Sequence, residues 1–184
     1  MSLTETPICN FGEKAKNFDL LSTENKKTSL DDVKGKNGTL VMFICNHCPY
    51  VKAVIKDIVK DAKYLETLGI KSAAIMSNDV KNYPEDSFEN MISFSKTHNF
   101  TFPYLIDETQ EVAKNYGAVC TPDFFGYNKN LELQYRGRIR ELKNLKPIGK
   151  GDSDLNVAMK SIAASGKGPK NQIPSMGCNI KWFK

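Results

Sequence analysis

The residues Thr39-Leu-Val-Met-Phe-Ile-Cys-Asn-His-Cys-Pro-Tyr-Val51 contain the pattern that decides the fold. The stretch from Thr39 to Ile44 is a nearly unbroken apolar run, which is typical of a strand that is covered on both faces. Beyond Pro49 the apolar residues recur every three or four positions as far as Leu65, with lysines on the opposite side. The pattern predicts a buried strand that leads into a long amphipathic helix, which stops near Gly69.

The rest of the chain alternates between the same two periods. Asp107 and Gln110 have the spacing of a capping box at the start of one helix. The order of elements implies an α/β sandwich around a mixed sheet. The expected elements are a strand at 70–76, a helix that follows Pro84, a broken strand at 102–106, a short helix that ends at Gly117, a hairpin at 124–136, a helix that follows Ser153 and ends at Gly166, and an extended tail.

Composition and charge exclude several classes of protein. With 184 residues, of which 40% are hydrophobic and 26% charged, the chain has an ordinary globular composition and not that of a disordered or fibrous protein. No apolar run approaches the roughly 18 residues of a membrane span. The last third of the chain is rich in basic residues, among them Arg136. They are scattered through the predicted strand, loop and tail, and no aromatic residues interleave with them. We therefore expect neither a membrane nor a nucleic acid as a partner.

The N-terminus and the cysteine count bear on the compartment. The first nine residues lack the basic and apolar regions of a signal peptide, which predicts a cytoplasmic protein. Thiols stay reduced in the cytoplasm unless they take part in a redox cycle. The chain has five cysteines, so a fully paired intrachain framework would leave one thiol over. The count argues against a secreted scaffold held together by disulfides.

The motif Cys45-Asn-His-Cys48-Pro49 occupies the turn between the predicted strand and helix. Two cysteines separated by two residues can close a small disulfide there, and such a motif beside a βαβ pattern indicates redox activity. The positive end of the helix dipole favours a thiolate on Cys45, and the thiolate is the form that attacks disulfides. Pro49 suits the first helical turn, where its missing N–H needs no partner.

Two other interpretations of this motif stay open. In the first, Cys45 and Cys48 are small core residues. In the second, they hold copper or zinc together with His47, and Cys120 is a further candidate ligand. The sequence has no second Cys-x-x-Cys and no pair of histidines at ligand spacing, so it gives a structural zinc site little support. We expect no metal and no cofactor.

The stretch Phe43-Ile-Cys-Asn-His-Cys-Pro-Tyr-Val51, followed by Thr121-Pro-Asp-Phe-Phe125, resembles the thioredoxin superfamily. More narrowly, the chain resembles the bacterial thioredoxin-like proteins of the redoxin, AhpC/TSA type, which are described as thiol–disulfide oxidoreductases. The similarity extends over nearly the whole chain. Its further shared stretches are Tyr-Pro-Glu-Asp at 83–86, residues 102–114, and Gly-Cys-Asn-Ile-Lys-Trp at 177–182.

The resemblance implies a thioredoxin-like three-layer sandwich, in which helices flank a mixed sheet. It also implies an N-terminal hairpin, a helical insertion around 84–98 and an extended C-terminal tail. The chain is then expected to be a single domain over 1–184, with its core at about 15–165 and its tail at 166–184.

The resemblance also implies roles for individual residues. Cys45 corresponds to the cysteine that attacks a partner disulfide, and Cys48 to the buried cysteine that resolves the mixed disulfide. Pro122, which Thr121 precedes, corresponds to a cis-proline that lies against the disulfide and positions the backbone of the partner. Thr121 and Pro122 are thus expected to support the chemistry of the two cysteines.

Three features depart from the pattern of reducing thioredoxins, one of which is Ile44 in place of the aromatic residue that usually precedes the motif. Asn46 and His47 replace the Gly-Pro between the cysteines, and a histidine there resembles the oxidising members, in which it stabilises the thiolate. The buried carboxylate of thioredoxins would fall at Met42 or Thr39, and neither residue is acidic. The sequence therefore names no base for Cys48.

Four further residues are candidates for supporting roles. Cys120 precedes Pro122 by two positions, and Cys178 lies in the tail, so each is a candidate third thiol or sulfur ligand. The competing interpretations are a buried spectator for Cys120 and a purely structural tail for Cys178. Tyr50 and Phe124 are expected to frame a groove for the partner beside the disulfide.

The preferred function is exchange of a Cys45–Cys48 dithiol with protein or small-molecule disulfides through a mixed disulfide. Its partners would be disulfide-containing proteins and a recycling reductant. An antioxidant peroxidase of the peroxiredoxin type is an alternative, because residues 15–35 are redoxin-like, but the pattern Pro-x-x-x-Thr/Ser-x-x-Cys ends at neither cysteine. A thiol-based metal-binding protein is a third possibility. The sequence predicts neither the direction of exchange nor the oligomeric state.

Overall fold

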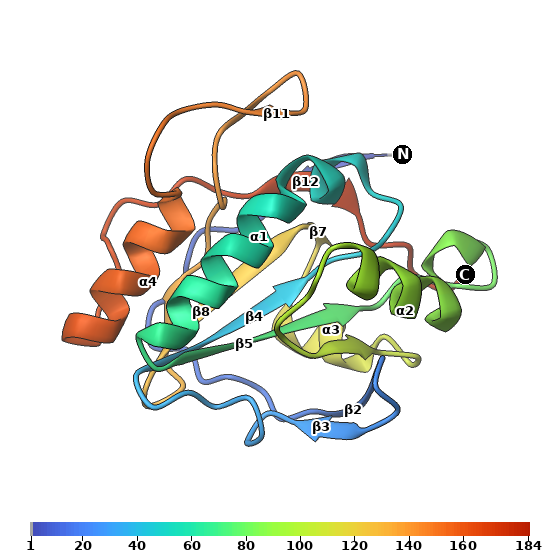
Figure 1. The fold of residues 1–184 in the computed structure, drawn as a ribbon, viewed down its shortest axis with the longest axis horizontal. Helices are drawn as coiled ribbons and strands as arrows, with labels where there is room; N and C mark the ends of the chain where they lie inside the picture. Colours follow the sequence, from blue (N-terminus) through green and yellow to red (C-terminus); the bar gives the residue numbers. More distant parts are fainter. Residues whose placement is uncertain (1) are drawn as a thin grey trace.

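The strand predicted at 39–44 is the central strand β4 (Gly38–Phe43), and all of its residues are buried. The computed structural model describes residues 2–184. β4 pairs in parallel with β5 (Ile70–Met76) and in antiparallel fashion with β8 (Asp123–Asn128), and Figure 1 shows it between these neighbours. The sheet is therefore mixed, as the sequence predicted.

Seven strands form this sheet, in the order β3-β2-β6-β5-β4-β8-β9. β6, β5 and β4 run parallel to one another, and the remaining pairs are antiparallel. β2 and β3 form the N-terminal hairpin, and β8 and β9 form the predicted second hairpin. The bounds are β2 (Asp19–Ser22), β3 (Lys27–Ser29), β6 (Tyr104–Ile106) and β9 (Leu133–Tyr135).

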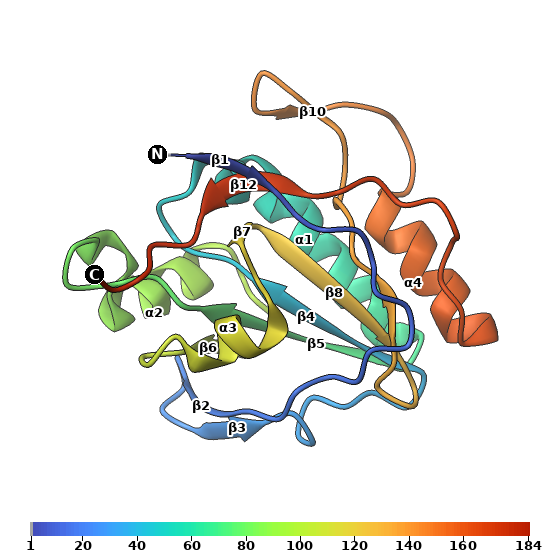
Figure 2. The ribbon, with the colours of Figure 1, turned by 180° about the vertical axis from the view of Figure 1, so that it is seen from behind.

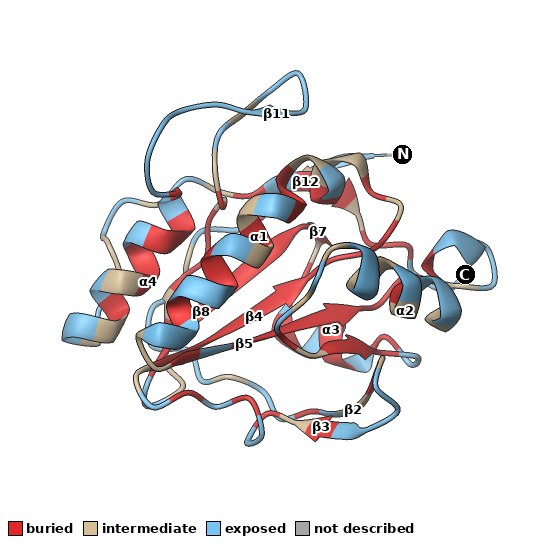
Figure 3. Cartoon of the chain, viewed as in Figure 1, coloured by how far each residue is buried: buried red, intermediate tan, exposed pale blue. Residues whose placement is uncertain are grey.

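Helices cover both faces of the sheet, as Figures 1 and 2 show: α1, α2 and α4 lie on one face and α3 on the other. Side chains alternate along a strand, so Leu40 and Met42 pack into one hydrophobic cluster and Val41 and Phe43 into a second. Figure 3 shows that the central strands β4 and β8 are buried. This arrangement confirms the three-layer sandwich. The helices are α1 (Pro49–Thr67), α2 (Phe88–Thr97), α3 (Glu111–Tyr116) and α4 (Asp154–Ser165).

The ends of α4 and the inserted segment follow the predictions. The Ser153 side chain accepts a hydrogen bond from the backbone N–H of Asn156 at 2.9 Å, which caps α4. Gly166 ends the helix with a φ of +74°, a conformation that favours glycine. The helical insertion consists of the short 3₁₀ helix η1 (Pro84–Asp86) and α2.

The capping box predicted from Asp107 and Gln110 is wrong. Asp107 lies outside the helix and accepts a hydrogen bond from the Ala113 N–H at 2.9 Å. Gln110 does not reach back to it, because its side chain donates instead to the backbone oxygens of Ser77 and Lys181, each at 2.8 Å. Gln110 therefore anchors the C-terminal tail to the core.

The tail enters a second, three-stranded sheet. In it β12 (Met176–Asn179) lies between β1 (Leu3–Glu5) and β7 (Cys120–Thr121), and both pairings are antiparallel. Figure 2 shows β1 and β12 side by side, with β7 next to them. In this register Cys178 lies opposite Thr121. The sheet thus brings the tail to the segment that precedes Pro122.

A short hairpin, β10 (Leu142–Lys143) with β11 (Lys146–Pro147), belongs to a long exposed loop that projects beyond α1 (Figures 1 and 3).

Arg136, which precedes this loop, is buried and forms an ion pair with Asp123 at 2.9 Å. The prediction that Arg136 is one of the solvated surface charges is therefore wrong. Burial raises the pKa of Asp123 to about 6, and Arg136 offsets part of this effect.

Among residues 2–184, no helix combines the length and apolar character that crossing a membrane requires.

Candidate active site

Cys45 and Cys48 lie in the turn between β4 and α1. Cys48 is the N-cap of the helix and Pro49 is its first residue, so the proline occupies the turn that its missing N–H suits. The side chains are almost fully covered, with 1% of Cys45 and none of Cys48 exposed to solvent. Both cysteines are reduced thiols in the structure.

Thr121 contacts both sulfurs. Its hydroxyl oxygen lies 3.4 Å from Sγ of Cys45, and its backbone oxygen lies 3.2 Å from Sγ of Cys48. The peptide bond between Thr121 and Pro122 is cis, the geometry that the resemblance implied. β7 and the cis-proline segment thus lie directly against the two cysteines.

The two sulfurs of the motif shift each other's pKa. A hydrogen bond from Cys45 is the main cause that lowers the pKa of Cys48 to about 5, and Thr121 and Cys178 add to it against the effect of burial. Burial raises the pKa of Cys45, and the neighbouring Cys48 raises it further. The lower pKa of the pair therefore belongs to Cys48, the N-cap residue, whose sulfur also accepts a hydrogen bond from the Val51 N–H. The thiolate on Cys45 that the sequence favoured stays a prediction for the attacking form.

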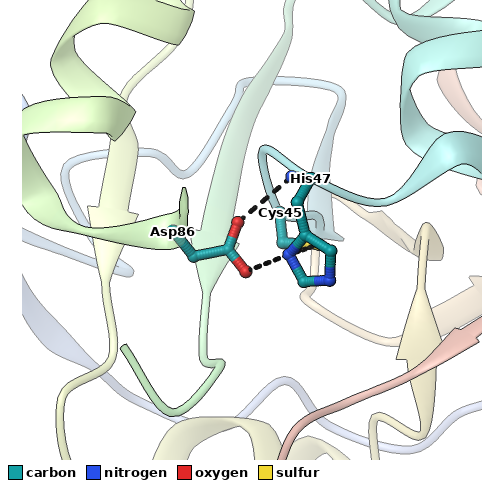
Figure 4. Close-up of side chains that lie close together, drawn as sticks. All are labelled: Cys45, His47 and Asp86. Atoms are coloured by element: carbon teal, nitrogen blue, oxygen red, sulfur yellow. Dashed lines mark hydrogen bonds and ion pairs between the residues drawn. The ribbon is translucent and has the colours of Figure 1, made fainter. Parts of the chain in front are cut away.

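His47 is held by a carboxylate that the sequence analysis did not identify. Its Nδ1 atom lies 2.6 Å from Oδ2 of Asp86, which is fully buried (Figure 4). Asp86 belongs to η1, so the helical insertion supplies it. The same Nδ1 atom lies 4.0 Å from Sγ of Cys45. The only signal in the sequence was the shared stretch at 83–86, which carries no indication of where its acidic residue points.

The carboxylate of Asp86 is saturated with hydrogen bonds. It accepts them from the backbone N–H groups of Asn46 at 2.8 Å and His47 at 3.2 Å, and from the Asn78 side chain at 2.8 Å. Burial alone would raise the pKa of Asp86, but the hydrogen bonds from His47 and Asn78 outweigh it and lower that pKa. The hydrogen bond to Asp86 raises the pKa of His47. The two residues thus form a hydrogen-bonded histidine–carboxylate pair near Cys45, in which Asp86 favours the protonated imidazole.

Asn46 supports the loop and does not face the sulfurs. Its side-chain amide donates to the backbone oxygen of Glu85 at 3.1 Å and accepts a hydrogen bond from the Tyr104 hydroxyl at 2.9 Å. The Tyr83 ring stacks on the His47 ring, with 5.7 Å between their centroids. These contacts fix the motif to the helical insertion.

The structure separates the two candidate third thiols. Cys120 is fully buried and its thiol donates to the backbone oxygen of Pro122 at 3.7 Å. Cys178 is 3% exposed and its thiol is hydrogen-bonded to Cys48. Of the two, Cys178 therefore makes the contact with the Cys-x-x-Cys pair.

A surface groove of about 440 Å³ runs beside the cis-proline. Tyr50 lines it together with Pro122, as the sequence predicted for Tyr50. Phe124 does not, because this residue of β8 is fully buried and packs in the core cluster under α1. Further lining residues come from the exposed loop and the tail, among them Leu142, Ile173 and Met176.

Within residues 2–184, Cys45, His47 and Asp86 are the group that could hold a metal ion, and their ligand atoms all lie within 4.8 Å of one another. This set contains Asp86 in place of the Cys48 and Cys120 ligands considered from the sequence. Asp86 already accepts four hydrogen bonds, one of them from the His47 nitrogen that faces it. The donor set therefore fits a hydrogen-bonded network better than a metal centre.

Known proteins are similar to this chain over most of its length. ResA, a thiol-disulfide oxidoreductase of Bacillus thuringiensis subsp. konkukian, is 30% identical over 130 residues, which are 69% of this chain and 69% of that protein. An uncharacterized conserved protein from Geobacillus kaustophilus is 39% identical with a TM-score of 0.93, over 100% of this chain and 97% of that one.

A more distant solved structure shares the fold. The thioredoxin domain of a thiol-disulfide oxidoreductase from Bacteroides vulgatus is 16% identical, with a TM-score of 0.58 over 73% of this chain and 89% of that chain. The sheet, the flanking helices and this neighbour together identify the fold as thioredoxin-like. The pattern of the AhpC/TSA family matches residues 11–142. The chain belongs to the AhpC/TSA family, in its thioredoxin-like redoxin form.

Proposed function

We propose that this protein is a thiol–disulfide oxidoreductase that works through Cys45 and Cys48. The observation that carries the proposal is the pair of sulfurs at the start of α1, both of which contact Thr121 beside the cis-proline. The similarity to proteins named thiol-disulfide oxidoreductases supports the same reaction class.

When the pair holds one thiolate, the Cys48 sulfur is the base that accepts the proton of Cys45. As Cys45 attacks, its proton passes to the Cys48 sulfur, whose thiol then donates to the Thr121 backbone oxygen 3.2 Å away. The Thr121 hydroxyl, 3.4 Å from Sγ of Cys45, donates to the new thiolate. Hydrogen bonds thus stabilise the pair both when the thiolate is on Cys48 and when it is on Cys45.

The reaction then follows two exchange steps. The Cys45 thiolate attacks one sulfur of the partner disulfide, so an S–S bond forms to Cys45 and the other partner sulfur leaves with the electron pair. Cys48 loses its proton and attacks Sγ of Cys45, which forms the Cys45–Cys48 bond and releases the second partner thiolate. Two electrons pass to the partner, whose two sulfurs take up two protons, and the reverse sequence oxidises a partner dithiol.

His47 and Asp86 position the positive charge beside Cys45. The imidazolium is 4.0 Å from Sγ of Cys45, so it stabilises the Cys45 sulfur whenever that sulfur is a thiolate, as nucleophile or as leaving group. The positive charge of His47 stabilises the reduced form of the protein, in which Cys45 can be a thiolate. A more stable reduced form makes the protein a stronger oxidant. Both sulfurs are covered, so the loop opens locally before a partner sulfur reaches Cys45.

The experiment that tests the proposal is insulin-disulfide reduction by variants of single cysteines. Cys45→Ser is expected to abolish the activity, whereas Cys120→Ser, which removes a buried thiol outside the pair, is expected to retain it. Full activity of Cys45→Ser would refute the mechanism. The reduction potential of the pair gives the direction, with a value near −270 mV typical of a reductant and one near −120 mV typical of an oxidant.

A thiol peroxidase is the second candidate, because the family match supports it. Its pattern Pro-x-x-x-Thr/Ser-x-x-Cys is absent around both cysteines, where Gly38 and Met42 precede Cys45 at the two positions. Consumption of hydrogen peroxide faster than insulin reduction would favour it.

The cytoplasmic location, the protein partners and the recycling reductant stay predictions. Fractionation of cells tests the location, and affinity trapping tests the partners and the reductant.

A further inference from the structure

The C-terminal strand β12 lies against the cis-proline segment. Cys178 is opposite Thr121 in the antiparallel pair, and Asn179 is opposite Cys120. Gly177 makes the approach possible: a Cβ atom there would meet the Thr121 backbone oxygen and lie 2.7 Å from its carbonyl carbon. The tail thus brings a third cysteine to the residue that already contacts both sulfurs of the Cys-x-x-Cys pair.

The strand is held from several sides. β1 pairs with its other edge and places Leu3 opposite Cys178. Beyond the strand, the Lys181 N–H donates to the Asn78 side chain at 2.9 Å, and its backbone oxygen accepts from Gln110 at 2.8 Å. Cys178 is therefore presented to the site by a fixed segment of chain.

The Cys178 sulfur faces Cys48 and not bulk solvent. It is 3% exposed, belongs to the same core cluster as Cys45 and Cys48, and is hydrogen-bonded to Cys48. Cys48 thus has two thiol neighbours, one in its own motif and one in the tail. This geometry gives Cys48 two alternative partners for a disulfide.

We propose that Cys178 is a third redox-active thiol, which takes over the disulfide bond to Cys48 from Cys45. The proposal deepens the proposed function and rests on it. In the oxidised protein the Cys178 sulfur attacks Sγ of Cys48, and the proton that Cys178 loses is balanced by the one that the leaving Cys45 takes up. The Cys48–Cys178 bond forms while the Cys45–Cys48 bond breaks, and Cys45 leaves with the electron pair and takes up a proton. The number of disulfides is unchanged.

The exchange has two consequences for the site. It stores the oxidised state between α1 and β12 and returns Cys45 as a thiol, so the protein can form a second mixed disulfide before it is recycled. Burial and the charge of Cys48 raise the pKa of Cys178 to about 12 in the dithiol form. Oxidation of Cys48 removes that neighbouring charge, which eases deprotonation of Cys178 when the exchange needs it.

Disulfide mapping in the Cys45→Ser variant tests the proposal. Trypsin places Cys48 in the peptide 37–52, Cys120 in 115–129 and Cys178 in 171–181, so each pairing has its own mass. After oxidation in glutathione buffers and blocking of remaining thiols with N-ethylmaleimide, we expect peptide 37–52 linked to 171–181. The link is expected to survive in Cys45→Ser/Cys120→Ser and to be lost in Cys45→Ser/Cys178→Ser.

Two results would overturn the proposal. One is complete N-ethylmaleimide labelling of Cys178 at every glutathione ratio, and the other is a Cys48 cross-link to peptide 115–129 in its place. The decisive variant keeps Cys178, so poor folding of a tail mutant does not affect the outcome. Failure of the proposed function is a separate result, since the wild-type protein would then form neither a Cys45–Cys48 link within peptide 37–52 nor a link from 37–52 to 171–181.

Discussion

The imidazole of His47 is bound to the carboxylate of Asp86 across 2.6 Å, although the two residues are 39 positions apart in the chain. One side of this pair belongs to the redox motif and the other to the helical insertion. Asp86 is fully buried and also accepts hydrogen bonds from the backbone of the motif. The insertion therefore builds the active-site loop as well as covering the sheet.

Replacing Asp86 by Asn is expected to weaken the site. The neutral amide no longer favours the imidazolium, so the pKa of His47 falls and the Cys45 thiolate loses a stabilising charge. We expect insulin-reduction kcat/KM to fall about tenfold, which corresponds to roughly 1.4 kcal/mol, and its pH profile to shift. The matched control is Glu85→Gln, the same chemical change at an exposed neighbour. Equal activity of Asp86→Asn and the control would contradict this role.

The same pair predicts how stability depends on pH. The pKa of His47 is raised on folding, so its contribution is full below about pH 6.5 and is lost as pH rises through the folded value. The pKa of Asp86 is lowered, so its contribution is full above about pH 4 and is lost as pH falls. Urea unfolding should show the largest difference between wild type and Asp86→Asn, about 2 kcal/mol, between these limits. A difference that grows above pH 8 would contradict the ion pair.

The dithiol is expected to carry one thiolate at neutral pH. Absorbance at 240 nm should rise with a midpoint near pH 5, as Cys48 titrates in the folded reduced protein. Cys48→Ser should remove this step, and Cys120→Ser should leave it in place. Because the pKa of Cys48 is lowered, its contribution to stability of the reduced form is full above about pH 8.5 and is lost toward pH 5. A first midpoint near pH 8.5 would contradict the lowered pKa of Cys48.

Tyr50 is expected to serve large partners more than small ones, since it lines the groove beside Pro122. Tyr50→Ala should lower kcat/KM with insulin about tenfold, roughly 1.4 kcal/mol, and leave the rate with oxidised glutathione within about twofold. Tyr64→Ala removes an exposed tyrosine from the same helix, away from the groove, and is the control. An equal loss with both substrates would show that Tyr50 supports the site and not the partner.

The approach of β12 to Thr121 should depend on Gly177. Gly177→Ala forces a Cβ onto the Thr121 carbonyl, so the strand moves away. We expect a loss of about 1–3 kcal/mol in urea unfolding and faster alkylation of Cys178. Met176→Ala changes an exposed residue of the same strand and should alter neither measurement. Unchanged alkylation in Gly177→Ala would contradict the close contact.

Local periodicity was sufficient to predict the elements that surround the motif. β4, β5 and α1 follow from apolar patterns within a few turns or strands, and Ser153 and Gly166 mark the ends of α4 through interactions inside the same helix. Such interactions depend on neighbours in sequence, so the sequence carries them directly.

The errors concern side chains whose partners are distant in sequence. Gln110 leaves its own helix to bind the tail at Lys181, which no spacing rule reveals. Phe124 is in the core because of the face of β8 on which it lies, whereas Tyr50 reaches the groove. Asp86 was missed for the same reason: its role depends on how the insertion folds back over the motif.

The most direct test of the central claim is the identity of the cysteine that binds a partner. Cys48→Ser lacks the resolving thiol, so incubation with insulin or a labelled peptide disulfide should trap a mixed disulfide that peptide mapping places on Cys45. The additional variant Cys45→Ser/Cys48→Ser should trap none. A trapped partner on Cys120 or Cys178, or equal trapping by the double variant, would contradict attack by Cys45.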